Sequence, residues 1–164
     1  MLMNKGDKIF GILGKQQISN PSNEPLCAYV KVALAADDSW EEDSNELPRL
    51  LTPQSILALI DTGADSSIID IDMARKLNLT VVGFQHVVLT GAPSTLPIVF
   101  VQICFVSEGH VAGKRLVAQN LRGLGGPTRH QVILGMDFLL DYDIHIAVEH
   151  NTVELTYLGR ARKE

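Results

Sequence analysis

Apolar residues in this chain occur in short runs, separated by Gly, Pro, Asn and Ser. Val and Ile fill many of the runs, and their branched side chains suit a pleated, half-buried surface. Short runs of this kind, bounded by turn residues, are typical of an antiparallel β protein. The expected strands are Lys8–Leu13, Cys27–Ala35, Ser55–Ile60, Ser67–Asp70, His86–Thr90, Leu96–Val106, Val111–Ala118, Gln131–Leu134, Ile144–Glu149 and Thr152–Tyr157.

Two segments break this pattern and predict short helices. In Asp72–Asn78, either Asp70 or Asp72 can cap the start, and Asn78 can end the helix in the left-handed conformation. The second segment, Met136–Asp141, follows a glycine and has its apolar residues at helical spacing. The predicted fold class is therefore all-β, mainly antiparallel, with one or two short helices. Between two of the strands, Gly91-Ala92-Pro93-Ser94 predicts the tip of a hairpin.

The bulk composition fits an ordinary globular protein. The 164 residues suit one domain, or less naturally two very small ones, and 46% are apolar and 20% charged. A net charge of −5 argues against nucleic acid as the main partner. Cys27 and Cys104 both lie in apolar runs, so we expect reduced core residues. We see neither a membrane-spanning run nor a secretory signal, so we expect no membrane contact and a cytoplasmic location by default.

Two regions flank the centre of the chain. Residues 1–50 combine two expected strands with a loop over 36–47 that carries six acids and no base around Trp40. This loop predicts a solvated, mobile segment or, alternatively, an acidic patch for a partner. The two strands could form part of a dimer sheet, or be an extension that occupies a cleft. We expect this region to pack on, or to be part of, the same domain as the rest of the chain. The polar tail, residues 159–164, is expected to be flexible.

The candidate chemistry lies in Asp61-Thr62-Gly63-Ala64, which directly follows the apolar run 56–60 and occurs once. Peptide hydrolysis without a metal needs one group that takes a proton from water and another that gives a proton to the carbonyl oxygen. Two carboxyls about 3 Å apart do both, because like charges that close share one proton. One such carboxylate per chain therefore predicts a homodimer on a two-fold axis.

A second element supports this interpretation: Val132-Ile133-Leu134-Gly135 is again an apolar run that ends in glycine and leads into a short helix. Together these residues resemble the retropepsin-type aspartic proteases of retroviruses, retrotransposons, bacteria and eukaryotic cells. The matching parts are Ala58 to Ile69, the hairpin around Thr90–Thr95, and Ile133 to Gly135 with its helix. The resemblance covers about Ser55 to Tyr157 and implies a catalytic domain over 51–158, folded as a closed acid-protease barrel or sandwich.

The resemblance also implies roles for single residues. Asp61 would be the catalytic carboxylate, and Thr62, Gly63 and Ala64 would support the loop and contact the second subunit. The expected substrate-binding residues are Gly63, Asp65, Thr90, Gly91 and Ala92, the last three in a flap that closes over the substrate. Ile133, Leu134 and Gly135 would brace the aspartate loop. The implied protein is an aspartic endopeptidase that is active as a homodimer, binds an extended peptide or protein substrate and needs no cofactor or metal.

Two alternatives stay open at this point. One is a retropepsin-fold module that dimerises or binds peptides without turnover, or is held inactive by its own N-terminal segment. The other is a chance motif in an unrelated β protein. A further expectation concerns Ala64, which lacks the hydroxyl that Ser or Thr would offer to the ionised aspartate. We therefore expect activity nearer weakly than strongly acidic pH.

The other polar residues do not show a pattern that indicates a metal site or a second catalytic site. Asp70 and Asp72 suit helix capping better than metal binding. The three acids near the second helix, Asp137, Asp141 and Asp143, predict surface or helix-terminal roles. The five histidines, His86, His110, His130, His145 and His150, show no metal-ligand spacing. Ser66 and Ser67 lack the Gly-x-Ser-x-Gly setting of a serine hydrolase.

Overall fold

The structure, a computed structural model, describes residues 3–15, 26–35, 50–52, 55–89, 91–105, 110–121 and 131–159. Its strands are β1 (Lys8–Lys15), β2 (Leu26–Ala35), β3 (Ile56–Ile60), β4 (Ile68–Asp70), β5 (Val81–Leu89), β6 (Ala92–Phe105), β7 (His110–Gln119), β8 (Val132–Leu134), β9 (Tyr142–Ala147) and β10 (Thr152–Tyr157). The helices are α1 (Ile71–Lys76), α2 (Met136–Leu139) and the 3₁₀ turn η3 (Val148–His150).

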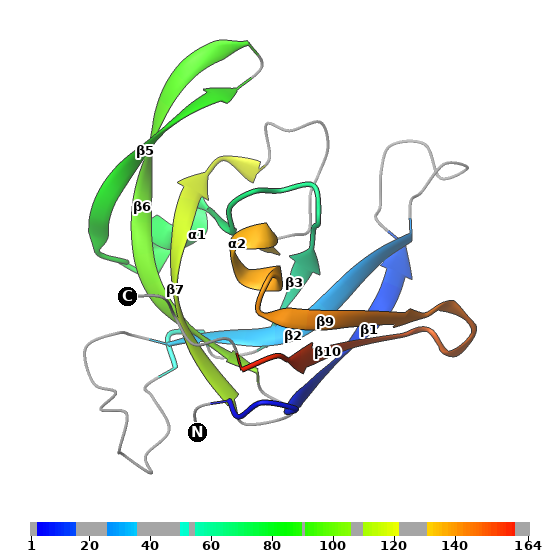
Figure 1. Ribbon diagram of the computed structural model, residues 1–164. Coiled ribbons are helices and arrows are strands. Elements are labelled where there is room, and N and C mark those ends of the chain that lie inside the picture. Colours follow the sequence, from blue (N-terminus) through cyan, green and yellow to red (C-terminus); the bar gives the residue numbers. More distant parts are fainter. Residues whose placement is uncertain are drawn as a thin grey trace.

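The centre of the molecule is a closed barrel (Figure 1). Strands β6, β7, β4, β8, β3 and β2 are hydrogen-bonded in that order, and β2 then pairs with β6, which closes the ring. Most pairs are antiparallel, but β3 runs parallel to β8 and β4 runs parallel to β7. The expected all-β fold with a closed barrel and two short helices is therefore confirmed.

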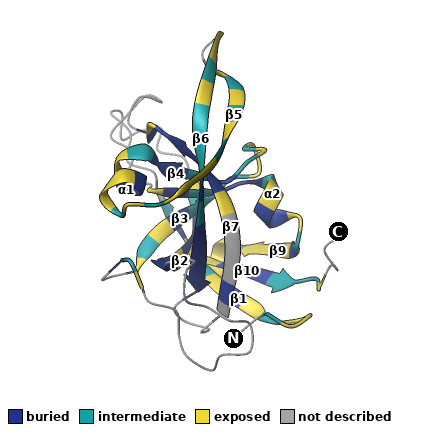
Figure 2. Ribbon diagram, turned by 90° about the vertical axis from the view of Figure 1, so that its left-hand side faces the viewer, coloured by how far each residue is buried: buried dark blue, intermediate teal, exposed yellow. Residues whose placement is uncertain are grey.

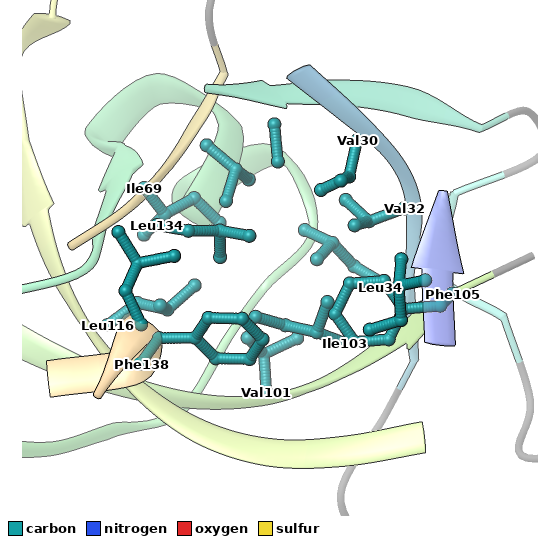
Figure 3. Close-up of a cluster of buried hydrophobic side chains, with 14 of the residues drawn as sticks. Val30, Val32, Leu34, Ile69, Val101, Ile103, Phe105, Leu116, Leu134 and Phe138 are labelled. Carbon is teal, nitrogen blue, oxygen red and sulfur yellow. The ribbon is translucent and has the colours of Figure 1, made fainter. Parts of the chain in front are cut away.

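Alternate residues of the barrel strands fill its interior. Val30, Val32 and Leu34 of β2 are fully buried, and so are Val101 and Ile103 of β6. Figure 3 shows these side chains with neighbours from β4, β7, β8 and α2 in one cluster. Because side chains of a strand alternate between faces, this period of two is what an inward-facing barrel surface requires. The intervening residues Ala33 and Ala35 of β2 are also buried, in a second, smaller cluster with Cys104 and Val111.

Three strands extend the sheet beyond the barrel. β2 pairs with β1 through Leu26–Val30 and with β6 through Val32–Ala35, and β1 then pairs with β10, which pairs with β9. At Gly11, where β1 passes from one partner to the other, a Cβ would lie 2.1 Å from the Tyr29 carbonyl oxygen. Glycine therefore permits a close backbone approach here. Both N-terminal strands belong to the same ten-stranded sheet as the centre of the chain.

On the opposite side of the barrel, β5 and the first half of β6 form a long hairpin that projects away from the body (Figure 1). Figure 2 shows exposed and intermediate residues along most of this hairpin, in contrast to the buried strands below it. The sequence expectation was wrong about its tip. Ala92 to Ser94 belong to β6 and pair with Val87–Leu89, so only Gly91, at a φ of 82°, lies at the described end.

The reason for this difference lies in the prolines of β6. Pro93 and Pro97 lack a backbone N–H, which normally excludes them from a strand that is paired on both edges. Pairing between β6 and β7 begins only at Ile98, so both prolines lie where β6 has β5 as its one described neighbour. β5 also starts earlier than the expected His86, at Val81, and its pairing with β6 shifts register between Val81 and Gly83.

The helix ends follow the predicted chemistry. The Asp70 side chain accepts hydrogen bonds from the Asp72 and Met73 N–H groups, and Asn78 takes the left-handed conformation at a φ of 52°. At the other end of the chain, the expected strand Ile144–Glu149 is wrong in its last two residues. Val148 and Glu149 form η3, because Asn151, at a φ of 55°, turns the chain back into β10.

Several sequence expectations fall outside the described residues: the acidic loop over 36–47, Thr90, and the tail beyond Gly159. The described helices include none that is long and apolar enough to span a membrane. Of the two thiols, Cys104 is buried as expected, whereas Cys27 is only half-buried, and neither forms a disulfide. Burial raises the pKa of the Cys104 thiol to about 11, which keeps it protonated at neutral pH.

Candidate active site

Asp61 lies at the point where β3 leaves the sheet. Its N–H donates to the Leu134 carbonyl of β8 at 3.0 Å, which continues the parallel β3–β8 pairing by one residue. Its side chain is half-buried, and the carboxylate oxygen Oδ1 accepts a hydrogen bond from the Gly63 N–H at 2.8 Å. The hydrogen bond to Leu134 therefore fixes the backbone position of Asp61. The hydrogen bond from the Gly63 N–H orients its carboxylate.

The turn after Asp61 does not require a left-handed conformation at Gly63. Gly63 does not have a positive φ, unlike Gly6, Gly91 and Gly159, so its backbone conformation is open to other residues. A Cβ at Gly63 would instead lie 3.2 Å from Asp61 Oδ1, tighter than most such contacts. Glycine here leaves room beside the carboxylate. The turn itself closes through the Ala64 N–H, which donates to the Asp61 carbonyl at 3.3 Å.

The loop from Asp61 to Ser67, which we term the aspartate loop, rests on the start of α2. The Met136 N–H donates to the Ala64 carbonyl at 2.7 Å, and the Asp137 N–H donates to the Asp65 carbonyl at 3.1 Å. These N–H groups belong to the first turn of α2, where a helix has no partners of its own for them. The N–H groups at the start of α2 and the carbonyl groups of the aspartate loop therefore provide each other's hydrogen-bond partners.

Gly135 lies directly beneath this crossing. A Cβ at Gly135 would come within 2.6 Å of the Ser66 carbonyl oxygen and 2.7 Å of the Ala64 carbonyl oxygen. Both atoms belong to backbone, so no side-chain rotation could relieve the clash. Ile133 and Leu134 precede it in β8, where Leu134 pairs with Ile60 and Ile133 pairs with both Leu59 and Ile68. The three residues predicted to brace the loop therefore lie behind it.

Two further residues of the loop's support were missed by sequence reasoning. The Asp137 carboxylate oxygen Oδ1 accepts hydrogen bonds from the Ser67 N–H at 2.8 Å and from the Ser67 hydroxyl at 2.6 Å. The same hydroxyl accepts a hydrogen bond from the Gly135 N–H at 3.1 Å. Asp137 was expected to have a surface or helix-terminal role. The sequence did indicate an acidic side chain in the first turn of the second helix. It did not indicate that this carboxylate would bind Ser67, 70 residues earlier.

The remaining predicted residues are spread over two places. Thr62, Gly63 and Asp65 are exposed on the aspartate loop, and Ala64 is half-buried. Gly91 and Ala92 are exposed at the free end of the β5–β6 hairpin. Figure 1 shows this end projecting beyond the barrel, well away from β9 and β10. The structure thus brings Asp61 to Ala64 together with Leu134 and Gly135, and leaves the hairpin residues on a separate arm.

Other candidate chemistry is absent from the described ranges. No group of three His, Cys, Asp or Glu residues there lies close enough to hold a metal ion. Asp70 caps α1 through one carboxylate oxygen, and its other oxygen accepts from the Leu121 N–H at 3.3 Å, so it has a structural role. The chemistry available in the described site is that of the Asp61 carboxylate.

The comparison with known families bears on this site directly. The family model described as aspartyl protease matches residues 53–138, more than half of the chain. The chain belongs to the aspartyl protease family. The match spans the aspartate loop, the β5–β6 hairpin and β8 up to Phe138 of α2. It confirms the family expected from the two motifs, and it removes the chance motif as an explanation.

Among solved structures, this aspartyl protease family member is similar to a retropepsin-like aspartic protease from Rickettsia conorii, with 16% sequence identity. The alignment covers 94% of this chain and 97% of that chain, with a TM-score of 0.48. No curated protein sequence matches the chain.

Proposed function

We propose that this protein is an aspartic endopeptidase whose active form is a homodimer, with one Asp61 carboxylate from each chain. The observation that carries the proposal is the placement of Asp61 on a short turn that is braced by β8 and α2. A catalytic carboxyl pair has to be held in a fixed geometry, because small displacements are costly in rate. The aspartate loop has the rigid support that such a pair would need.

The proposed reaction uses both carboxyls in opposite protonation states. The ionised Asp61 takes a proton from a water molecule, whose oxygen bonds to the scissile carbonyl carbon. The protonated Asp61 of the second copy gives its proton to the carbonyl oxygen, and a tetrahedral diol results. Collapse of this intermediate breaks the C–N bond, and the departing nitrogen receives a proton from the carboxyl that first took one. As the carbonyl of the acid product re-forms, a diol hydroxyl returns its proton to the carboxylate of the second copy, which restores the shared proton.

The substrate in this proposal is an extended peptide. Exposed backbone and side-chain groups at Gly63 and Asp65 would hydrogen-bond its main chain, as in strand addition. Thr62, exposed beside them, would contact the second subunit. Thr90, Gly91 and Ala92 would belong to the flap, the β5–β6 hairpin closing over the peptide to exclude water.

The test is a peptide-library digest with the wild-type protein and Asp61→Asn, between about pH 3 and pH 7. We expect cleavage by the wild type and a loss on the order of 10²–10⁴-fold or more in the variant, because an amide cannot exchange the proton. Asp72→Asn is the matched control: Asp72 is an exposed aspartate whose 3.5 Å ion pair with Arg75 lies in α1. It should cleave like the wild type.

The outcomes separate the proposal from its alternative. Equal cleavage by the wild type and Asp61→Asn would mean that the activity belongs to another group or to a contaminant. A dimer that binds peptides and cleaves none over the whole pH range would establish the silent, peptide-binding module instead.

A further inference from the structure

Residues 3–7, which we term the strap, lie before β1 and are bound to the end of β10. The Gly6 N–H donates to the Tyr157 carbonyl at 2.8 Å, and the Tyr157 N–H donates to the Asp7 carbonyl at 2.9 Å. Within the strap, the Asp7 N–H donates to the Asn4 carbonyl at 3.0 Å, and the Asn4 N–H donates to the Asp7 carboxylate at 2.6 Å. The strap therefore holds a defined position beside β10.

Met3 binds the first residue of the strap to the interior of the molecule. Its side chain is half-buried and packs on the main apolar core cluster. The Tyr142 hydroxyl donates to the Met3 sulfur Sδ at 3.2 Å, and Tyr142 is 7% exposed. Burial raises the pKa of the Tyr142 phenol well above its usual range, so the hydroxyl stays protonated and needs an acceptor. Among the described residues, the Met3 thioether is that acceptor.

Tyr142 connects this contact to helix α2. Its ring stacks on the Phe138 ring with the centroids 4.7 Å apart, and its centroid lies 5.5 Å from that of Tyr157. Phe138 is buried in α2, whose first turn holds the aspartate loop. Two aromatic rings and one short helix therefore connect Met3 with the candidate active site.

The Met3 sulfur is a group that a peroxide can oxidise. A sulfur lone pair bonds to one peroxide oxygen as the O–O bond breaks, and the second oxygen takes up the proton of the first and leaves as water. The sulfur loses two electrons, which the peroxide gains, and an apolar thioether becomes a polar sulfoxide. Because Met3 is half-buried and Met73 is buried in the core, the oxidant reaches Met3 more readily.

The sulfoxide does not fit the contact that the thioether makes. The Met3 sulfur and the Tyr142 oxygen lie only 3.2 Å apart, so a further oxygen has no room between them. A hydrogen bond from Tyr142 to the sulfoxide oxygen needs about 2.7 Å between the two oxygens, so the sulfur would have to move away. If the sulfoxide oxygen instead turns toward solvent, the buried hydroxyl loses its acceptor, which is costly. Either arrangement weakens the contact between the strap and Tyr142.

We propose that Met3 is an oxidation site, and that hydroperoxides acting on it release the strap and loosen the hold of α2 on the aspartate loop. The modification is reversible, because methionine sulfoxide reductases restore the thioether. The loosening concerns the folded chain itself. Its effect on peptide cleavage rests on the proposed function.

Peroxide treatment followed by tandem mass spectrometry tests the site of oxidation. All proteins carry Cys27→Ser, which removes a half-buried thiol that peroxide would also attack. We expect Met3 to gain one oxygen at a peroxide dose that leaves Met73 reduced. Met136 is the other half-buried methionine of the described residues, so its oxidation has to be measured in the same spectra.

Hydrogen exchange of the oxidised and untreated proteins tests the loosening. The amides of Gly6 and Tyr157 should exchange roughly tenfold faster after oxidation, the ratio that corresponds to one lost buried hydrogen bond. The amides of Met136 and Asp137, which bind the aspartate loop, should exchange faster by a smaller factor. The amides of the β5–β6 hairpin should not change.

Two leucine variants assign the effect to one methionine. Met3→Leu keeps an apolar side chain of similar volume that peroxide does not oxidise, so its exchange should not respond to peroxide. Met136→Leu is the matched control and should respond as the Cys27→Ser protein does. Under the proposed function, peroxide should lower the cleavage rate about three- to tenfold except in Met3→Leu. Methionine sulfoxide reductases with a thiol should restore the rate, and the thiol alone should not.

Three results would overturn the proposal: a Met3 that stays reduced while Met136 is oxidised, an oxidised Met3 with unchanged exchange in the strap and α2, or an equal response in Met3→Leu. Faster exchange that Met3→Leu abolishes and Met136→Leu retains would support it. The proposed function is judged separately. An untreated protein that cleaves no peptide contradicts only the peptidase, because mass spectrometry and hydrogen exchange do not depend on activity.

Discussion

The aspartate loop and the β5–β6 hairpin both carry residues predicted to meet the substrate, yet the chain holds them in different ways. The aspartate loop is tied to β8 and α2 by hydrogen bonds from Met136, Asp137 and Gly135. The hairpin is a two-stranded ribbon on which Phe84 is 67% and Val88 is 73% exposed. Isolated two-stranded ribbons gain little stability of their own. The molecule thus combines a firmly braced carboxylate with a weakly supported arm.

The most damaging change to the braced side should be Gly135→Ala. Its Cβ would meet two backbone carbonyls at 2.6 and 2.7 Å, so the loop or α2 has to move. We expect a loss of about 1–3 kcal/mol in the free energy of unfolding together with most of the peptidase activity, measured by urea denaturation and peptide cleavage. Gly83→Ala on the hairpin is the control, since its Cβ would find its nearest atom at 3.9 Å. If Gly135→Ala keeps its stability and activity, the aspartate loop and α2 can move apart at little cost in free energy.

Asp137→Ala removes the acceptor of both Ser67 hydrogen bonds without touching a predicted catalytic residue. We expect the unfolding free energy to fall by about 1–2 kcal/mol. Amide exchange should also become faster in the aspartate loop, while exchange in the hairpin stays as in the wild type. Hydrogen exchange followed by mass spectrometry measures both regions in one experiment. Asp141→Ala, a neighbouring acid, should change neither, and a uniform rise in exchange would contradict the localised effect.

On the β5–β6 hairpin, by contrast, we expect a substitution to affect substrate binding more than stability. Phe84→Ser removes an exposed apolar side chain, so the unfolding free energy should stay within about 0.5 kcal/mol of the wild type. If the hairpin covers a bound peptide, the lost apolar contact should raise KM by up to about tenfold. Steady-state cleavage kinetics check this, with Gln85→Ala on the other face of β5 as the control. A stability loss like that of Asp137→Ala would erase the contrast between the two regions.

The smallest expected effect concerns the chemistry at the loop itself. Ala64→Ser adds a hydroxyl in the turn that Ala64 closes on Asp61. A donor beside the carboxylate favours its ionised form, so the acidic limb of the pH–rate profile should move to lower pH by about half a unit. Ala64→Gly, which adds no donor, should leave the limb in place. An unmoved limb in Ala64→Ser would mean that the hydroxyl does not reach the carboxylate.

The barrel strands were predictable because their apolar runs are short, rich in Val and Ile, and bounded by turn residues. Helix α1 was equally predictable from the sequence. Asp70 caps its start and Asn78 ends it, and both act within a few residues of the helix ends. The hairpin was harder to predict. Gly83 and the two prolines weaken the strand pattern of 81–97, and pairing between β5 and β6 outweighs them.

The support of the aspartate loop was predictable only in part. Gly135 stood out as a glycine at the end of an apolar run, and its position behind the loop agrees with the brace that the family resemblance implied. The bond between Ser67 and Asp137 joins residues 70 positions apart, and neither residue has a local pattern that names the other. This contact depends on the antiparallel pairing of β4 with β8, because Ser67 directly precedes β4 and Asp137 follows β8 in α2.

Because β6 is long, a small rotation at the base of the β5–β6 hairpin moves its tip by a large distance. Ala92 to Pro97 lie beyond the point where β7 begins to pair, and six residues of strand span about 20 Å. The register shift at Val81 and Gly83 sits at the base of this span. A rotation of about 14° there would carry the tip through roughly 4.8 Å, about the spacing between neighbouring strands of a sheet. Under the proposed function, such a movement would let the hairpin admit or enclose a peptide, while β2, β3, β4 and β8 keep their pairing in the barrel.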